Sequence, residues 1–143
     1  MRKTKILFVH NNTNNREGKF SPMLQSALRK WGDVSLTVVR SWAETYHALS
    51  TQEWDGAVLS GSPATLSDFV PGDILARNSL VIHQMNAPAL GVCFGMQVMA
   101  YSLGGDVGLL PDRCTGVQSV HVRRSVLFRS DGTISTRHAH GDC

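Results

Sequence analysis

The sequence predicts an α/β protein with an open, mostly parallel sheet and helices on both faces. Two observations carry this prediction. Between residues 5 and 105, short apolar runs alternate with segments whose apolar residues recur at helical spacing. The strand-like runs are almost continuously apolar, which is typical of parallel strands that are buried on both faces.

The first strand and helix are predicted from apolar patterns and end signals. Residues 5–10 (KILFVH) form a β-branched and aromatic strand that ends in the turn-forming run 11–15. Pro22 opens an amphipathic helix, and Gly32-Asp33 stops it. The apolar face of this helix would carry Leu24, Ala27, Leu28 and Trp31. The elements that follow are a strand over 34–39, a short helix over 42–49 and a buried strand over 56–59.

A strand, a cysteine and a helix follow one another in the second part of this region. A helix is predicted within residues 74–85, and a short apolar strand over 88–92 leads directly into Cys93. The next helix ends at Gly104-Gly105. Beyond it the pattern changes to peripheral antiparallel strands, over 117–122, 126–128 and 133–136, around a turn at 130–132.

Composition limits the class of protein. With 143 residues, 42% of them hydrophobic, and no repeat or linker, the chain predicts a single domain over residues 1–143. No apolar run approaches the roughly 18 residues that span a bilayer, and the apolar start is too short for a signal peptide. The net charge of +3 is mild and scattered, so we expect neither nucleic acid nor a membrane as a partner.

The cysteines indicate the compartment. The chain has three, Cys93, Cys114 and Cys143, without a C-x-x-C spacing. This pattern predicts neither a disulfide framework nor a zinc site, and it favours a reducing, cytoplasmic location. We expect no metal and no cofactor.

Cys93 is the candidate nucleophile. Gly91-Val92-Cys93-Phe94-Gly95 has the G-x-nucleophile-x-G form of a nucleophile elbow, in which small residues relieve crowding at a sharp strand-to-helix turn. The N-terminus of the next helix favours a thiolate and an oxyanion. The alternative interpretation is that Cys93 is a small buried hydrophobic residue.

The loop Ser60-Gly61-Ser62-Pro63 follows the preceding strand and opens at the same carboxyl edge of the sheet. It could place a backbone N–H opposite the N–H of Phe94, which would give an oxyanion hole with two donors. Considered alone, the same loop is better explained as a plain Ser/Gly/Pro turn.

These motifs resemble the class I glutamine amidotransferase family. Residues 88–97 (PALGVCFGMQ) resemble its nucleophile motif, and residues 59–63 (LSGSP) resemble its oxyanion loop. Leu103-Gly104-Gly105 and His140-Gly141-Asp142 are further matches, so the similarity covers nearly the whole chain. Met96-Gln97 and the His-Gly-Asp segment are most similar to the amidotransferase part of GMP synthases. The resemblance implies a flavodoxin-like fold that is incomplete at its C-terminus.

The resemblance also implies roles for single residues. Cys93 would form a glutamyl thioester, and Phe94 with Gly61 and Ser62 would hold the oxyanion. Gln97 would help to seat the substrate. Glutamine would be hydrolysed to glutamate and ammonia, and the ammonia would pass to a separate synthetase subunit.

Two departures from the family pattern affect the chemistry. Ser62 stands where many relatives carry Gly, and its side chain is expected to narrow the approach to the oxyanion hole. The chain also contains no His-x-Glu, the segment from which the family takes its base. We therefore interpret the chain as C-terminally truncated, or as using His138 or His140 as the base with Asp142 as a possible orienter. His10 is a weaker candidate.

Three functional hypotheses follow. The first is a glutamine amidotransferase with the Cys93 thioester chemistry. The second is an inactive or truncated amidotransferase-like protein that binds glutamine or a partner, because a triad that lacks its base loses several orders of magnitude in rate. The third is a cysteine hydrolase of γ-glutamyl bonds, which would need no synthetase partner.

Overall fold

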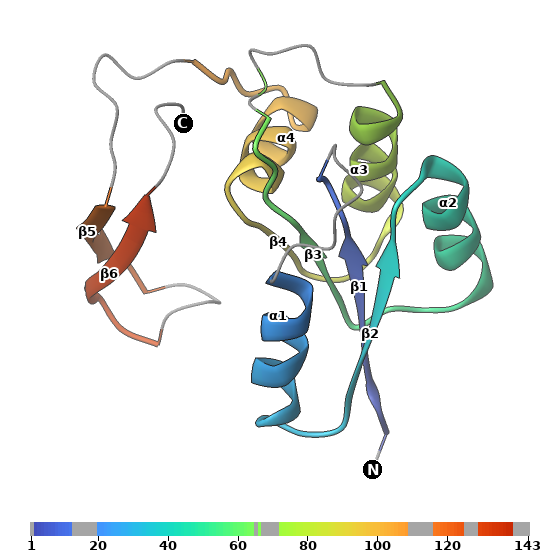
Figure 1. Cartoon of the computed structure of the whole chain (residues 1–143), viewed down its shortest axis with the longest axis horizontal. Coiled ribbons are helices and arrows are strands. Elements are labelled where there is room, and N and C mark those ends of the chain that lie inside the picture. Colours follow the sequence, from blue (N-terminus) through green and yellow to red (C-terminus); the bar gives the residue numbers. More distant parts are fainter. Residues whose placement is uncertain are drawn as a thin grey trace. The chain divides into compact units, whose positions relative to one another are not determined.

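The computed structural model describes residues 2–12, 20–64, 66, 72–108, 116–124 and 129–138. The chain divides into two compact units, Met1–Val107 and Gly108–Cys143. Each unit has its own sheet (Figure 1). The single domain over residues 1–143 stays a prediction beside this division.

The larger unit is built on a four-stranded sheet in the order β2-β1-β3-β4. Its strands are β1 (Thr4–Val9), β2 (Val34–Val39), β3 (Gly56–Leu59) and β4 (Ala89–Gly91). Every neighbouring pair is parallel, so all four carboxyl ends lie along one edge. This arrangement confirms the predicted mostly parallel α/β sheet and the four predicted strands, to within two residues at their ends.

Four helices alternate with these strands: α1 (Phe20–Arg29), α2 (Trp42–Thr51), α3 (Gly72–Gln84) and α4 (Phe94–Ser102). Each predicted helix is present. The helix α1 begins before Pro22, at Phe20, so that Pro22 lies in its first turn. A proline is tolerated there because the N–H that it lacks would have no helical partner. It also ends before Trp31, which is 87% exposed, so the prediction that Trp31 belongs to the apolar face of this helix is wrong.

The core lies on both faces of the sheet. Leu7, Val9 and Leu59 cluster with Ala48 of α2 and Val81 of α3. Phe8 of β1 is also buried, and because side chains alternate along a strand it points to the opposite face. Burial on both faces explains why β3 and the second half of β1 are continuously apolar.

The smaller unit contains a two-stranded antiparallel sheet of β5 (Gly116–Val122) and β6 (Gly132–His138). It confirms the antiparallel strands predicted over 117–122 and 133–136. The third predicted strand, over 126–128, lies outside the described residues. Among the helices of the described part of the chain, none is both long and apolar enough to cross a bilayer.

Candidate functional site

Cys93 occupies a strained turn between β4 and α4. Its backbone angles are φ 53° and ψ −113°, and it is the one described non-glycine residue with a positive φ. Such a conformation costs on the order of 1–3 kcal/mol and persists only where the surrounding structure enforces it. Cys93 makes no disulfide and is partly buried. This is the geometry that the elbow motif predicts.

The two flanking glycines are required by close backbone contacts. A Cβ at Gly95 would lie 2.1 Å from the carbonyl oxygen of Leu59, the last residue of β3. A Cβ at Gly91 would lie 2.6 Å from the backbone nitrogen of Met96 in α4. Both distances are too short for any side chain, so the first turn of α4 packs directly on the strand ends. The sharp turn at Cys93 depends on these two contacts.

The loop after β3 lies against the elbow. A Cβ at Gly61 would be 3.4 Å from Cys93 Cβ and 3.5 Å from the carbonyl oxygen of Val92. The Val92 N–H also donates to the Leu59 carbonyl at 3.0 Å. The structure therefore brings together the two loops that the sequence predicts at one edge of the sheet.

The first N–H groups of α4 lie at this junction. The N–H groups of Gly95, Met96 and Gln97 bond to the carbonyls of Val92 and Cys93, and the Phe94 N–H is not used in these bonds. Ser62 is buried, and its Oγ accepts a hydrogen bond from the Ala64 N–H at 3.2 Å. The Ser62 hydroxyl is thus engaged with its own loop.

Gln97 is buried beneath the same loop. Its Oε1 accepts a hydrogen bond of 3.4 Å from the Leu66 N–H, and its side chain is 3% exposed. This contact ties α4 to the segment after Ser62. A role for Gln97 in seating glutamine stays a prediction.

Sequence reasoning missed a group of buried polar side chains at the carboxyl edge. Asn11 follows β1, Ser60 follows β3 and Asn78 lies on α3. All three are buried, and Asn11 is hydrogen-bonded to both of the others. A signal for Asn78 was present, because it shares the i, i+4, i+7 spacing of the buried Ile74 and Val81. A polar residue on an apolar helix face indicates a buried hydrogen-bonding partner.

Of the three predicted bases, only His10 has a side chain within the described part of the chain. His138 ends β6 in the smaller unit, and its side chain lies outside the described part, as do His140 and Asp142. His10 is buried at the carboxyl end of β1, where its N–H donates to the Val39 carbonyl. His138, His140 and His10 stay predicted candidates for the base.

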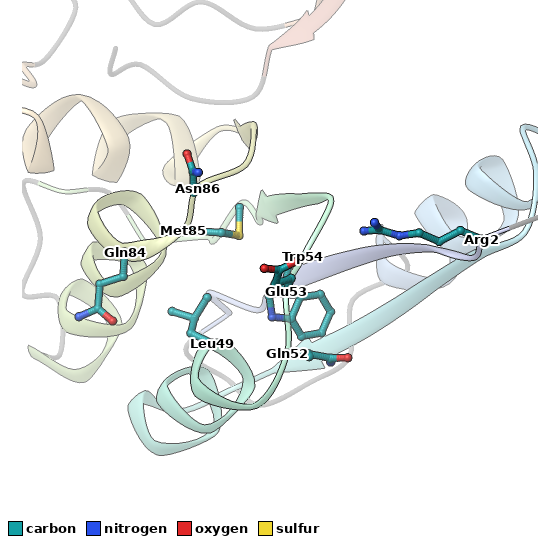
Figure 2. Close-up of a pocket in the computed structure, with 8 residues that line it drawn as sticks. All are labelled: Arg2, Leu49, Gln52, Glu53, Trp54, Gln84, Met85 and Asn86. Atoms are coloured by element: carbon teal, nitrogen blue, oxygen red, sulfur yellow. The ribbon is translucent and has the colours of Figure 1, made fainter.

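A cavity of about 320 Å³ lies at the other end of the strands (Figure 2). It is formed where α2 and α3 end and β3 begins, and Trp54, Leu49 and Met85 supply its apolar wall. The rest of its lining is polar: Arg2, Gln52, Glu53, Gln84 and Asn86. Within the described residues, no group of three His, Cys, Asp or Glu side chains is placed to hold a metal ion.

Comparison with known protein families shows to which family the chain belongs. The model of the family "Glutamine amidotransferase class-I" matches residues 14–143. The chain belongs to this family. Among curated relatives of this amidotransferase, GMP synthase [glutamine-hydrolyzing] of Vibrio vulnificus is 36% identical over 90 residues, which cover 62% of this chain and 17% of that protein. The enzyme of the same name from Nitrosococcus oceani is 42% identical over 67 residues, 47% of this chain and 12% of that protein.

Comparison with solved structures agrees with this family membership. A GMP synthase subunit from Thermoplasma acidophilum superimposes with a TM-score of 0.76 at 25% identity, covering 99% of this chain and 67% of that one. A glutamine amidotransferase from Methylobacillus flagellatus matches the fold alone, with a TM-score of 0.61 at 18% identity over 98% of this chain and 55% of that one. The amidotransferase chain thus spans about two thirds of the Thermoplasma structure and 17% of the Vibrio enzyme.

Proposed function

We propose that this amidotransferase hydrolyses glutamine to glutamate and ammonia through a thioester on Cys93. One observation carries the proposal: Cys93 sits in a strained elbow with Gly61 of the oxyanion loop packed against it. The name of the Vibrio and Nitrosococcus relatives, glutamine-hydrolyzing GMP synthase, supports the choice of glutamine as substrate.

The chemistry would run in two acyl-transfer steps. The Cys93 thiolate attacks the side-chain amide carbon of glutamine, and the negative charge that develops on the amide oxygen is stabilised by the N–H groups of Phe94 and the loop at Ser62. Proton donation to the amide nitrogen releases ammonia and leaves the γ-glutamyl thioester. A water molecule then attacks the thioester, which gives glutamate and regenerates the thiol.

The position of Cys93 favours the thiolate. Cys93 directly precedes α4, whose N-terminus presents the positive end of the helix dipole to the sulfur. The same N-terminus supplies the Phe94 N–H for the oxyanion. One structural feature therefore serves both the nucleophile and the transition state.

Three finer points belong to this proposal. His138 or His140 would act as the base that activates water. The ammonia would pass to a separate synthetase subunit, because the relatives that this chain matches are named GMP synthases. The reaction would take place in the cytosol.

The test is ammonia release from glutamine by the full chain, compared with Cys93→Ala. We expect release by the unaltered chain and loss of release in Cys93→Ala, whereas Cys114→Ala, used as the matched control, retains it. Release that persists in Cys93→Ala would contradict the thioester mechanism.

The second candidate is an inactive amidotransferase-like protein that binds glutamine. Modification of Cys93 by the glutamine analogue diazo-oxo-norleucine without ammonia release would select this alternative. Release of ammonia from glutamine would exclude it.

A further inference from the structure

We propose that Asn11 and Asn78 are positioning residues for the oxyanion hole, because their paired side chains hold Ser60, whose hydroxyl in turn holds the Gly61 carbonyl of the peptide group between Gly61 and Ser62. This inference rests on the proposed function. It deepens that function by naming residues that act on the oxyanion loop and not on glutamine itself.

The two side-chain amides form a closed pair. Asn11 Nδ2 donates to Asn78 Oδ1 at 3.1 Å and to the Ser60 carbonyl at 3.0 Å. Asn78 Nδ2 donates to Asn11 Oδ1 at 2.7 Å and to the Ile74 carbonyl at 2.7 Å. Both asparagines are fully buried. Each amide thus uses both of its N–H groups and its oxygen, so any rotation of either side chain would leave a buried group without a partner.

The pair joins three elements around Ser60. Asn11 follows β1, Asn78 lies on α3 and Ser60 follows β3. Ser60 is held further by its N–H, which donates to the Val9 carbonyl at 3.0 Å, and by its Oγ, which accepts the Asn11 N–H at 2.8 Å. The start of the oxyanion loop is therefore restrained from both β1 and α3.

Ser60 passes this restraint to the next peptide group. Its Oγ donates to the Gly61 carbonyl at 3.0 Å while it accepts the Asn11 N–H, which uses the hydroxyl both as a donor and as an acceptor. A trans peptide group is planar, so its C=O and the following N–H point in opposite directions. Holding the Gly61 carbonyl toward Ser60 therefore fixes the direction of the Ser62 N–H, the predicted oxyanion donor.

The consequence for catalysis follows from the position of Gly61. Gly61 packs against Cys93 Cβ, so a rotation of this peptide group would occur beside the nucleophile. An oxyanion hole stabilises the transition state only when its donors are held in place before the reaction. Loss of the asparagine pair should therefore weaken reactions that build an oxyanion, and spare simple alkylation of the thiol.

Two electrophiles separate these effects in the full chain. Diazo-oxo-norleucine carries a carbonyl where glutamine does and needs the glutamine site, whereas iodoacetamide needs only an accessible thiolate. The measured quantity is the ratio of the two second-order rate constants for modification of Cys93. Asn78→Asp keeps the shape of the side chain but removes the Nδ2 donor, and Ser60→Ala removes the hydroxyl that holds Gly61.

The matched control is Thr45→Val. Thr45 is fully buried in α2, and its Oγ1 donates to the Ser41 carbonyl at 2.8 Å. This variant loses a partly buried hydrogen bond within α2 that does not involve residues 60–63. It therefore shows whether the loss of a side-chain hydrogen bond elsewhere in the fold changes the rate ratio.

We expect the rate ratio to fall about tenfold or more in Asn78→Asp and in Ser60→Ala, and to stay unchanged in Thr45→Val. A ratio within about twofold of the unaltered chain in both loop variants would overturn the inference. If Asn78→Asp does not fold, as judged by circular dichroism, Ser60→Ala decides alone. If diazo-oxo-norleucine does not modify Cys93 in the unaltered chain, the proposed function fails, and this inference fails with it.

Discussion

The two ends of the parallel sheet differ in how they use polar groups. At the carboxyl edge, the buried Asn11 is hydrogen-bonded to the buried Ser60 and Asn78. Gly95 allows α4 to touch the backbone of β3. At the amino edge, Arg2 pairs with Asp55 on the surface, and a cavity opens between the ends of α2 and α3 (Figure 2).

The difference shows at which edge the positions of side chains and loops are fixed. Burying polar side chains is favourable only when every group finds a partner, so a buried network selects one geometry. An exposed ion pair contributes little free energy and does not select a single geometry. Among the described residues, the carboxyl edge has the more extensive network of buried side chains, which is the kind of restraint that holds a group in one position.

Adding a methyl group at the elbow should have the largest effect. Gly95→Ala places a Cβ against the Leu59 carbonyl, and such overpacking against backbone should lower the free energy of unfolding by about 3 kcal/mol. We expect the modification of Cys93 by diazo-oxo-norleucine to be lost as well. Chemical denaturation and intact mass measure the two effects.

Gly72→Ala is the matched control for this prediction. Gly72 begins α3, and a Cβ there meets no atom within 4 Å. Stability should change by less than about 1 kcal/mol, and alanine is the better helix former. Equal losses in Gly95→Ala and Gly72→Ala would contradict the argument from close contact.

Two arginines offer the next comparison. Arg77 is 4% exposed at the carboxyl edge, where it donates to the Arg40 carbonyl and to Asp73, and Arg77→Ala should cost about 3 kcal/mol. The Arg2 side chain is 72% exposed, and Arg2→Ala should cost less than about 1 kcal/mol. Denaturant midpoints measure both, and a larger loss in Arg2→Ala would invert the comparison.

Polar residues of the amino-edge cavity should have the smallest effect. Gln52 and Gln84 are exposed at its rim, so Gln52→Ala and Gln84→Ala should change stability by less than about 0.5 kcal/mol. The rate of Cys93 modification should be unchanged in both. A clear fall in that rate would show that the two edges are coupled.

The strand and helix order was predictable because local patterns determine it. Parallel strands buried on both faces read as apolar runs, as in residues 56–59, and the elbow was visible because two glycines at fixed offsets from Cys93 have a steric cause. The extent of α1 was less predictable. Trp31 has the spacing of an apolar helix face, but α1 ends before it.

The buried polar network could not be predicted from local sequence. Asn11 falls within an asparagine-rich run that reads as a turn, and its partner Asn78 lies 67 residues further along the chain. A hydrogen bond between such distant residues depends on the register of β1, β3 and α3. Only the folded structure supplies that register.

The most direct test of the account is the intact mass of the full chain after exposure to diazo-oxo-norleucine, with and without glutamine. We predict one adduct, located on Cys93, absent from Cys93→Ala and slowed by glutamine. Modification of Cys93 by iodoacetamide but not by diazo-oxo-norleucine would contradict the central claim that the elbow and its loop form a glutamine site.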